Sequence, residues 1–185
     1  MNKKPTIAIY GGAFDPPHWG HYKIVRDTLI NRNVDQVFVV PTYVHRFGKQ
    51  MSPFEDRYNM CLRMFNTMRS YRGNIFVDDV EKDLYDESEG RTVNLIQHYR
   101  TKWGTAMRIA LIIGYDNWDR KDEWYKFDTI MNIIDEIIIA PKGQYIERST
   151  DIRKAIANNK PYDSTITRSS VLEYIENHEL YREQC

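Results

Sequence analysis

Five short apolar runs, spread over most of the chain, constrain its fold more than any other feature of the sequence. They are rich in β-branched and aromatic residues and are TIAIY (6–10), QVFVVP (36–41), NIFVDD (74–79), RIALIIG (108–114) and EIIIAP (136–141). Most are apolar without strict alternation, which is typical of strands buried on both faces of a parallel sheet. Helix-like stretches separate and follow them, at 19–31, 53–69, 92–103, 122–134, 150–158 and 169–178. This alternation predicts an α/β fold with a doubly wound, mainly parallel sheet of five to six strands and helices on both faces.

The length of the chain favours one domain. Its 185 residues suffice for one sizeable core. We expect a single domain over 1–185, whose carboxyl-terminal part, from about 149 to 185, is helical. Lysine plus arginine equals aspartate plus glutamate, at 26 residues each. Proteins that bind nucleic acids usually carry a basic excess, so this balance argues against a nucleic-acid partner.

The chain shows no sign of export or membrane insertion. No uninterrupted apolar run approaches the ~18 residues of a membrane span. The amino-terminal apolar segment breaks at Gly11 and Gly12, too early for a signal peptide. Cys61 and Cys185 lack metal-binding spacing and are weak evidence for a disulfide. We therefore predict a cytoplasmic protein with no membrane partner, and homo-oligomer formation stays open.

Two of the predicted helices carry start signals. In SPFEDR, Ser52 has the place of an N-cap, Pro53 that of the first helical residue and Glu55 that of the partner in a capping box. Ser149 or Thr150 can cap the helix that contains DIRKAI in the same way.

The loop after the first run, GGAFDPPHWGH (11–21), is the most informative segment. In doubly wound sheets, ligands bind outside the carboxyl ends of the strands. Gly11 and Gly12 let a ligand approach the backbone, and amides here, with the following helix amino terminus, form an anion site. His18 and His21 lie three residues apart, on one face of the first turn if a helix begins at Trp19. Two imidazoles beside amide donors suit an oligophosphate.

Two other interpretations of this loop stay open. The first is a tight strand-to-helix turn whose histidines are incidental. The second is half of a zinc site, although no cysteine or second histidine cluster completes the usual ligand set.

The string GGAFDPPHWGH resembles the GGxFDPxHxGH form of the (H/T)xGH signature of the nucleotidyltransferase superfamily. Members join a nucleoside triphosphate to a phosphorylated or carboxylated small molecule and release pyrophosphate. The resemblance implies a Rossmann-like fold. It also implies an ATP site that includes Gly11, Gly12, Ala13, Phe14, His18 and His21.

Further segments are similar to the nicotinate (nicotinamide) mononucleotide adenylyltransferase branch of that superfamily. They are VPTYVHRFGKQMSPFEDRYNM (40–60), GRTVNLIQHYR (90–100), LIIGYDNWDRKDEWYKF (111–127), STDIR (149–153) and VLEYIENHELY (171–181). The second segment departs from the family pattern SYTxxTL at Gly90, Arg91 and Leu95. Glu147 and Arg148 replace the usual Ile-Ser before STDIR, and the 141–149 connection is short for the family.

This resemblance assigns the site residues. It implies ATP binding by Gly114, Asp116, Ser149, Thr150 and Arg153, and binding of the second substrate by Arg46, Lys49, Thr92 and Trp124; the catalytic residues are His18, His21 and Arg153. The residue types fit these roles, because Trp124 can stack on a pyridine ring and Arg153 offers a fork for phosphate oxygens. Packing, capping, turn formation and solvation are the competing interpretations of these side chains.

The resemblance implies a function in NAD biosynthesis. The expected reaction joins ATP and nicotinate mononucleotide into nicotinate adenine dinucleotide and pyrophosphate. Mg²⁺ is expected to arrive with ATP, because it prefers water and phosphate ligands, and no protein residue is assigned as a metal ligand. Three alternatives stay open: nicotinamide mononucleotide as acceptor, another small phosphorylated acceptor, or a non-catalytic nucleotide-binding regulator.

Overall fold

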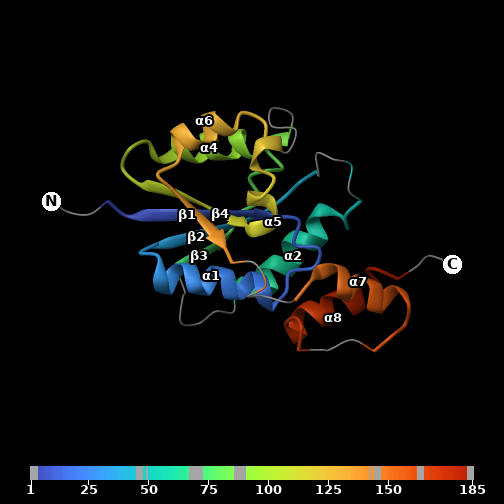
Figure 1. Ribbon diagram of the computed structural model, residues 1–185. Helices are drawn as coiled ribbons and strands as arrows, with labels where there is room; N and C mark the ends of the chain where they lie inside the picture. The colour runs from blue at the N-terminus through green and yellow to red at the C-terminus, as the bar shows by residue number, and fades with distance from the viewer. Residues whose placement is uncertain are drawn as a thin grey trace.

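The computed structural model describes residues 4–44, 48, 50–66, 73–85, 91–141, 143, 147–161 and 165–182. Its centre is one sheet whose strands are β1 (Thr6–Gly12), β2 (Gln36–Pro41), β3 (Ile75–Val77), β4 (Arg108–Gly114) and β5 (Glu136–Ala140). Their order across the sheet is β3-β2-β1-β4-β5, and every neighbouring pair is parallel (Figure 1). The prediction of a doubly wound, Rossmann-like parallel sheet is confirmed, with five strands among the described residues.

Most helices fall close to the predicted stretches, but the short helix Tyr115–Trp118 was not predicted, and the stretch 122–134 is not one helix. The helices are α1 (Trp19–Asn31), α2 (Phe54–Phe65), α4 (Thr92–Trp103), α5 (Tyr115–Trp118), η2 (Lys121–Glu123), α6 (Phe127–Ile133), α7 (Ser149–Ala157) and α8 (Ser169–Asn177). The predicted single helix over 122–134 is wrong. Lys126 adopts a left-handed conformation with φ 53°, so the chain leaves η2 and starts α6 anew.

Among the described residues, no helix has both the length and the apolar composition needed to cross a bilayer.

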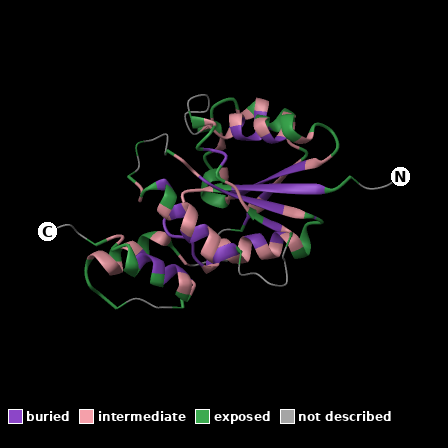
Figure 2. Cartoon of the chain, turned by 180° about the vertical axis from the view of Figure 1, so that it is seen from behind, coloured by how far each residue is buried: buried purple, intermediate pink, exposed green. Residues whose placement is uncertain are grey.

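Helices cover both faces of the sheet. α4 and α6 lie on one face, while α1 and α2 lie on the other (Figure 1). Successive β1 residues alternate between the two cores, so Ile7 and Ile9 pack toward α4 and α6, and Ala8 and Tyr10 toward α1 and α2. The buried residues run along the strands and the inward sides of the helices (Figure 2).

The carboxyl-terminal helices lie at the carboxyl ends of the strands, beside α2 (Figure 1). α8 buries a stripe of apolar side chains, Val171, Leu172, Tyr174 and Ile175, in the same core as β1 and α2. This shared core supports the single domain over 1–185 that we propose.

Both predicted helix caps are wrong, because tertiary contacts take the groups that a cap would use. α2 begins at Phe54 with Pro53 in the N-cap position and no side-chain cap bond. The backbone N–H of Ser52, which a capping box would give to Glu55, donates to Oδ2 of Asp15 at 3.4 Å, and Glu55 pairs with Lys82 at 2.7 Å.

The start of α7 shows the same effect. Arg148 holds its N-cap position, and Ser149 is already helical. The Ser149 hydroxyl donates a hydrogen bond of 2.8 Å to the carbonyl oxygen of Pro16, in the loop after β1.

Candidate active site

A cavity of about 570 Å³ opens where the strand order reverses, between β1 and β4 at their carboxyl ends. This is the place where doubly wound sheets bind ligands. Six of the residues predicted for the site line it: Gly11, Gly12, Ala13, Thr92, Gly114 and Trp124. Gly11 and Gly12, predicted in the loop, are instead the last two residues of β1, paired with Val40 and Pro41 of β2. The fold therefore brings the end of β1 and the start of its loop together with residues from three later segments.

The other predicted residues lie elsewhere. His18, His21, Ser149, Thr150 and Arg153 do not line this cavity but gather around the loop that follows β1. Asp116 is exposed in the first turn of α5, away from the cavity lining. Arg46 and Lys49 lie outside the described residues.

The Phe14 side chain is buried and packs against Tyr10 and Phe65. A ligand could therefore meet only its backbone.

The rings of His18 and His21 lie against each other at the start of α1. His18 is the N-cap residue and His21 lies in the first turn, with ring centroids 3.7 Å apart and planes inclined by 31°. The backbone N–H of His18 donates to Nδ1 of His21 at 3.2 Å. An Nδ1 that accepts this bond assigns the ring proton of neutral His21 to Nε2, which then serves as a donor.

Burial keeps both imidazoles uncharged. Burial lowers the pKa of His18 to about 4, against an opposing effect of the Glu147 carboxylate and with help from Lys23. Burial, and then the neighbouring His18, hold the pKa of His21 well below its usual value. At neutral pH the pair therefore offers N–H donors rather than fixed charges, and an incoming phosphate would favour the protonated forms.

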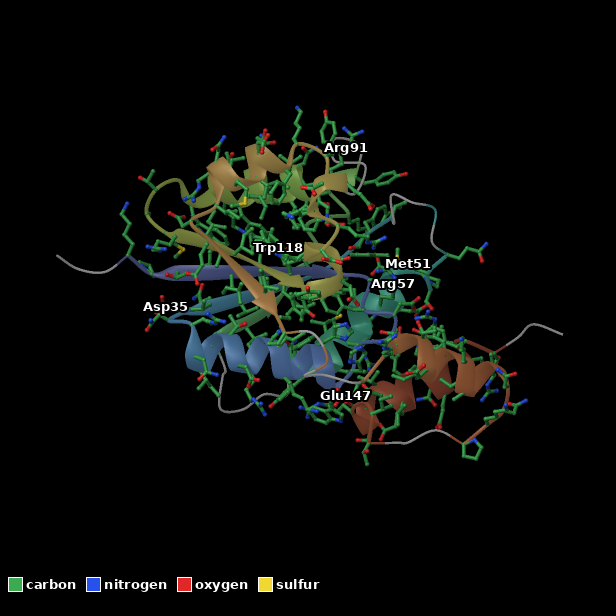
Figure 3. All side chains as sticks on the ribbon, viewed as in Figure 1. Asp35, Met51, Arg57, Arg91, Trp118 and Glu147 are labelled. Carbon is green, nitrogen blue, oxygen red and sulfur yellow. The ribbon has the colours of Figure 1, made fainter. Side chains whose placement is uncertain are left out.

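Gly20 allows this arrangement. A Cβ atom on Gly20 would lie 3.0 Å from Nδ1 of His18 and 3.3 Å from Oε2 of Glu147. The His18 ring thus rests directly on the backbone of α1. Glu147 approaches from the segment before α7 and also pairs with Lys23 on α1. Figure 3 shows Glu147 near the junction of α1 and the carboxyl-terminal helices.

Side chains of the carboxyl-terminal helical part donate hydrogen bonds to the backbone carbonyls of the loop after β1. Arg153 donates to the carbonyl of Asp15, Ser149 to that of Pro16 and Thr167 to that of Pro17, the last two at 2.8 Å. The loop is therefore positioned by donors from α7 and from the segment that leads into α8.

Asp15 joins the same arrangement through its side chain, which is buried. Its Oδ1 accepts a hydrogen bond from the Tyr181 hydroxyl at 2.8 Å, and its Oδ2 lies 4.0 Å from Nη1 of Arg153. Tyr181 belongs to the segment after α8, so the far end of the described chain also contacts the loop.

Arg57, which the motifs did not single out, holds the loops that border the site. Its side chain is only 1% exposed, yet it donates to four backbone carbonyls. These belong to Ala13 at 3.0 Å, Thr42 at 2.6 Å, Tyr43 at 3.2 Å and Ser52 at 2.8 Å. Arg57 thereby ties the loops after β1 and β2 to the start of α2, at the carboxyl ends of the strands (Figure 3).

Glu81 is a second residue that sequence reasoning missed. It is 6% exposed, lines the cavity and accepts the backbone N–H of Tyr43 at 2.9 Å. Burial raises the pKa of Glu81 to about 7, against the opposing effects of that hydrogen bond and of Arg57. Nothing in the local pattern DVEKD marks Glu81 as buried, so only tertiary packing could reveal it.

These pKa values predict two opposite effects of pH on stability. The His18 pKa is about 4 in the folded protein and 6.5 ordinarily, so its contribution to the unfolding free energy is full above pH 6.5 and is lost as the pH falls toward 4. The Glu81 pKa is about 7 in the folded protein and 4.5 ordinarily, so its contribution is full below pH 4.5 and is lost as the pH rises through 7.

The Glu81→Gln variant should therefore lose stability more steeply than the wild type on acidification from pH 6.5 to 4.5. On acidification the free energy of unfolding falls because of His18, and in the variant no gain from protonation of Glu81 offsets that fall. Urea unfolding of both proteins at the two pH values measures this. An equal or shallower dependence in the variant would contradict the assigned pKa directions.

The model of the cytidylyltransferase-like family matches residues 9–166. The chain is 32% identical to a protein of Anaeromyxobacter dehalogenans named a probable nicotinate-nucleotide adenylyltransferase, over 98% of this chain and 100% of that protein.

Solved structures agree with these sequence matches. One from Vibrio parahaemolyticus, which carries the same family name, has a TM-score of 0.78 at 27% identity and covers 97% of both chains. The nicotinic acid mononucleotide adenylyltransferase of Plasmodium falciparum, solved with NaAD, has a TM-score of 0.76 at 19% identity, covering 96% of this chain and 97% of that one. At 19% identity, the similarity to the Plasmodium falciparum structure shows a shared fold alone.

Proposed function

Because the chain belongs to the nicotinate-nucleotide adenylyltransferase family, we propose that it joins ATP and nicotinate mononucleotide into nicotinate adenine dinucleotide and pyrophosphate, in NAD biosynthesis. The observation that carries this proposal is the cavity between β1 and β4. It has the glycines of the phosphate-binding motif on one side and Thr92 and Trp124 on another. A single space thus serves two substrates.

The chemistry follows from this arrangement. An oxygen of the mononucleotide 5′-phosphate attacks the α-phosphorus of ATP in line, a new P–O bond forms, and the bond to the bridging oxygen of the leaving pyrophosphate breaks. The attacking phosphate is anionic at neutral pH, so no general base is required. Catalysis then consists of aligning two anions and stabilising the charge of the transition state.

We assign the ATP phosphates to the segment of Gly11, Gly12 and Ala13 and to the His18–His21 pair. The support is the donor chemistry of the site, since His21 is arranged to present Nε2–H and the segment lies against the cavity. Phe14 and Gly114 would contribute through backbone groups.

α7 would complete the ATP site. Arg153 would add positive charge, although in this structure it also supports Asp15 through the loop carbonyl. The Ser149 hydroxyl already donates to Pro16, so its contribution would come from the backbone. Thr150, whose hydroxyl accepts from Arg153 at 3.3 Å, would stay close to the phosphates. Asp116 remains our proposal for the ribose hydroxyls.

The mononucleotide would bind against Trp124 and Thr92. Trp124 is half-buried at the cavity wall and offers an aromatic face for a pyridine ring. Thr92 is the first residue of α4, so its amide belongs to the open end of that helix and can donate to a ligand. Arg46 and Lys49, outside the described residues, keep their proposed role as phosphate contacts.

Mg²⁺ is proposed to accompany ATP. Within the described ranges, no group of three or more His, Cys, Asp or Glu side chains forms a candidate metal site. The donor set therefore fits an ion carried by the ATP phosphates and water rather than a protein cage. When bound, the ion would neutralise part of the phosphate charge; the remaining positioning falls to the residues above.

The test is a pyrophosphate-release assay with ATP and either nicotinate mononucleotide, nicotinamide mononucleotide or no acceptor. We expect release that depends on an acceptor and is faster with the nicotinate form. Faster release with the nicotinamide form would overturn the acceptor assignment. ATP binding by calorimetry without release for any acceptor would overturn the enzymatic function in favour of a nucleotide-binding regulator.

A further inference from the structure

Arg91 lies at the wall of the cavity where the acceptor ring is expected. It is the N-cap residue of α4, directly before Thr92, and is half-buried. It lines the same cavity as Thr92, Trp124 and Tyr125. Figure 3 shows it on the α4 and α6 side of the molecule, above the ends of the strands.

The Tyr125 ring holds the Arg91 guanidinium. The Cζ atom of Arg91 lies 4.0 Å from the centroid of that ring. At this distance the cation–π contact fixes the position of the guanidinium, whose N–H donors lie in its own plane. Because Tyr125 and Trp124 both line the cavity, this contact places a donor-only cation in the same cavity as the indole proposed to stack on the pyridine.

The two possible acceptors differ at one group on that ring. Nicotinate carries a carboxylate, with two acceptor oxygens and a negative charge, while nicotinamide carries a neutral carboxamide with an NH₂ donor. Arginine has five donors, no acceptor and a permanent charge, so it pairs in a bidentate manner with a carboxylate and gains less from an amide. An arginine at this wall therefore discriminates between the two.

Other charged side chains in the cavity lining also affect the binding of a carboxylate. The other charged side chains of the cavity lining are Arg120, Glu81 and Glu123. Glu81 would repel a carboxylate when ionised, but burial raises its pKa to about 7, so it is partly protonated at neutral pH. Arg91 and Arg120 are the two lining groups that attract an anion among the described residues.

We propose that Arg91 is a specificity-determining residue whose guanidinium, held on Tyr125, donates to the carboxylate of a pyridine ring stacked on Trp124. This rests on the proposed function. The resemblance to the family does not supply it, because Arg91 departs from the family pattern SYTxxTL at this position. The proposal thus names a recognition device particular to this chain.

The experiment compares KM for nicotinate and nicotinamide mononucleotide in the wild type, Arg91→Gln and Arg91→Lys. Loss of a charged hydrogen bond typically weakens binding by about 10- to 100-fold. We expect a rise of that size in KM for the nicotinate form in Arg91→Gln, with less than about a threefold change for the nicotinamide form. Arg91→Lys should fall between, because lysine keeps the charge but loses the fork.

Arg120→Gln is the matched control, since it removes a guanidinium from the same cavity. Its ratio of the two KM values should stay close to that of the wild type. An equal rise of both KM values in Arg91→Gln would assign Arg91 to the shared phosphate and overturn the proposal. An unchanged ratio of the two KM values in Arg91→Gln would also overturn the proposal. So would a change of that ratio in Arg120→Gln alone.

This failure can be told apart from a failure of the proposed function. The proposed function fails if the wild type releases no pyrophosphate with either mononucleotide, whatever the variants do. Thermal melts of the variants exclude misfolding as the cause of a KM change, and Arg91→Lys provides a second reading if Arg91→Gln is unstable.

Discussion

Replacing His21 with alanine should lower turnover by about 10²–10³-fold when ATP and the mononucleotide are saturating, because one aligned donor to transition-state charge typically contributes that much. The bond from the His18 amide to Nδ1 of His21 orients the ring so that Nε2–H is the group left for a phosphate oxygen. Alanine removes this donor and also the ring that lies against His18. The steady-state rate of pyrophosphate release is the measurement.

His98→Ala is the control for that variant. His98 lies on α4, outside the cavity lining, and packs edge-on against Tyr99. Its turnover should stay within about threefold of the wild type, far from the 10²-fold expected of a removed transition-state donor. Near wild-type turnover in His21→Ala, with substrates saturating, would end the assignment of His21 to catalysis.

Replacing Arg57 with methionine should destabilise the protein and loosen the site together. Four carbonyls lose a donor, and each buried polar group left unpaired costs about 1–3 kcal/mol. Relief of the buried charge offsets part of this, since burial lowers the pKa of Arg57 against the opposing effect of Asp15. We expect a net loss of at least about 2 kcal/mol in the free energy of unfolding.

For a chain of this size, a loss of that order lowers the melting temperature by about 4–8 °C. Arg63→Met on the same helix is the matched control, because Arg63 donates to Asn59 within α2 and stacks on Tyr174. It should melt within about 2 °C of the wild type. An Arg57→Met protein as stable as the control would show that the loops after β1 and β2 do not depend on Arg57.

The strands could be predicted because their signal is local. Each β-branched run, such as QVFVVP at β2, contains its own evidence of burial on both faces. Helix starts were less predictable. The hydroxyl of Ser149 had the right chemistry for a cap, but it donates a hydrogen bond to the carbonyl of Pro16, far away in the sequence.

The candidate site divides in the same manner. The motif of Gly11, Gly12, His18 and His21 could be proposed from the sequence because its residues lie within one short segment, and Trp124 and Thr92 could be proposed by resemblance. Arg57 and Glu81 could not, because lone charged residues in polar segments are normally solvated. Their importance arises from burial among loops that meet only after folding.

The sequence by itself determined the parallel sheet, the position of the GGAFDPPHWGH motif at the end of β1 and the family of the chain, because these depend on residues close together. Only the tertiary structure decided which groups support that motif and which side chains line the cavity proposed for the second substrate. Arg57 lies on α2 and Arg153 on α7, while Arg91 directly precedes α4. Their contacts depend on how those helices pack at the ends of the strands, and no local pattern encodes that packing.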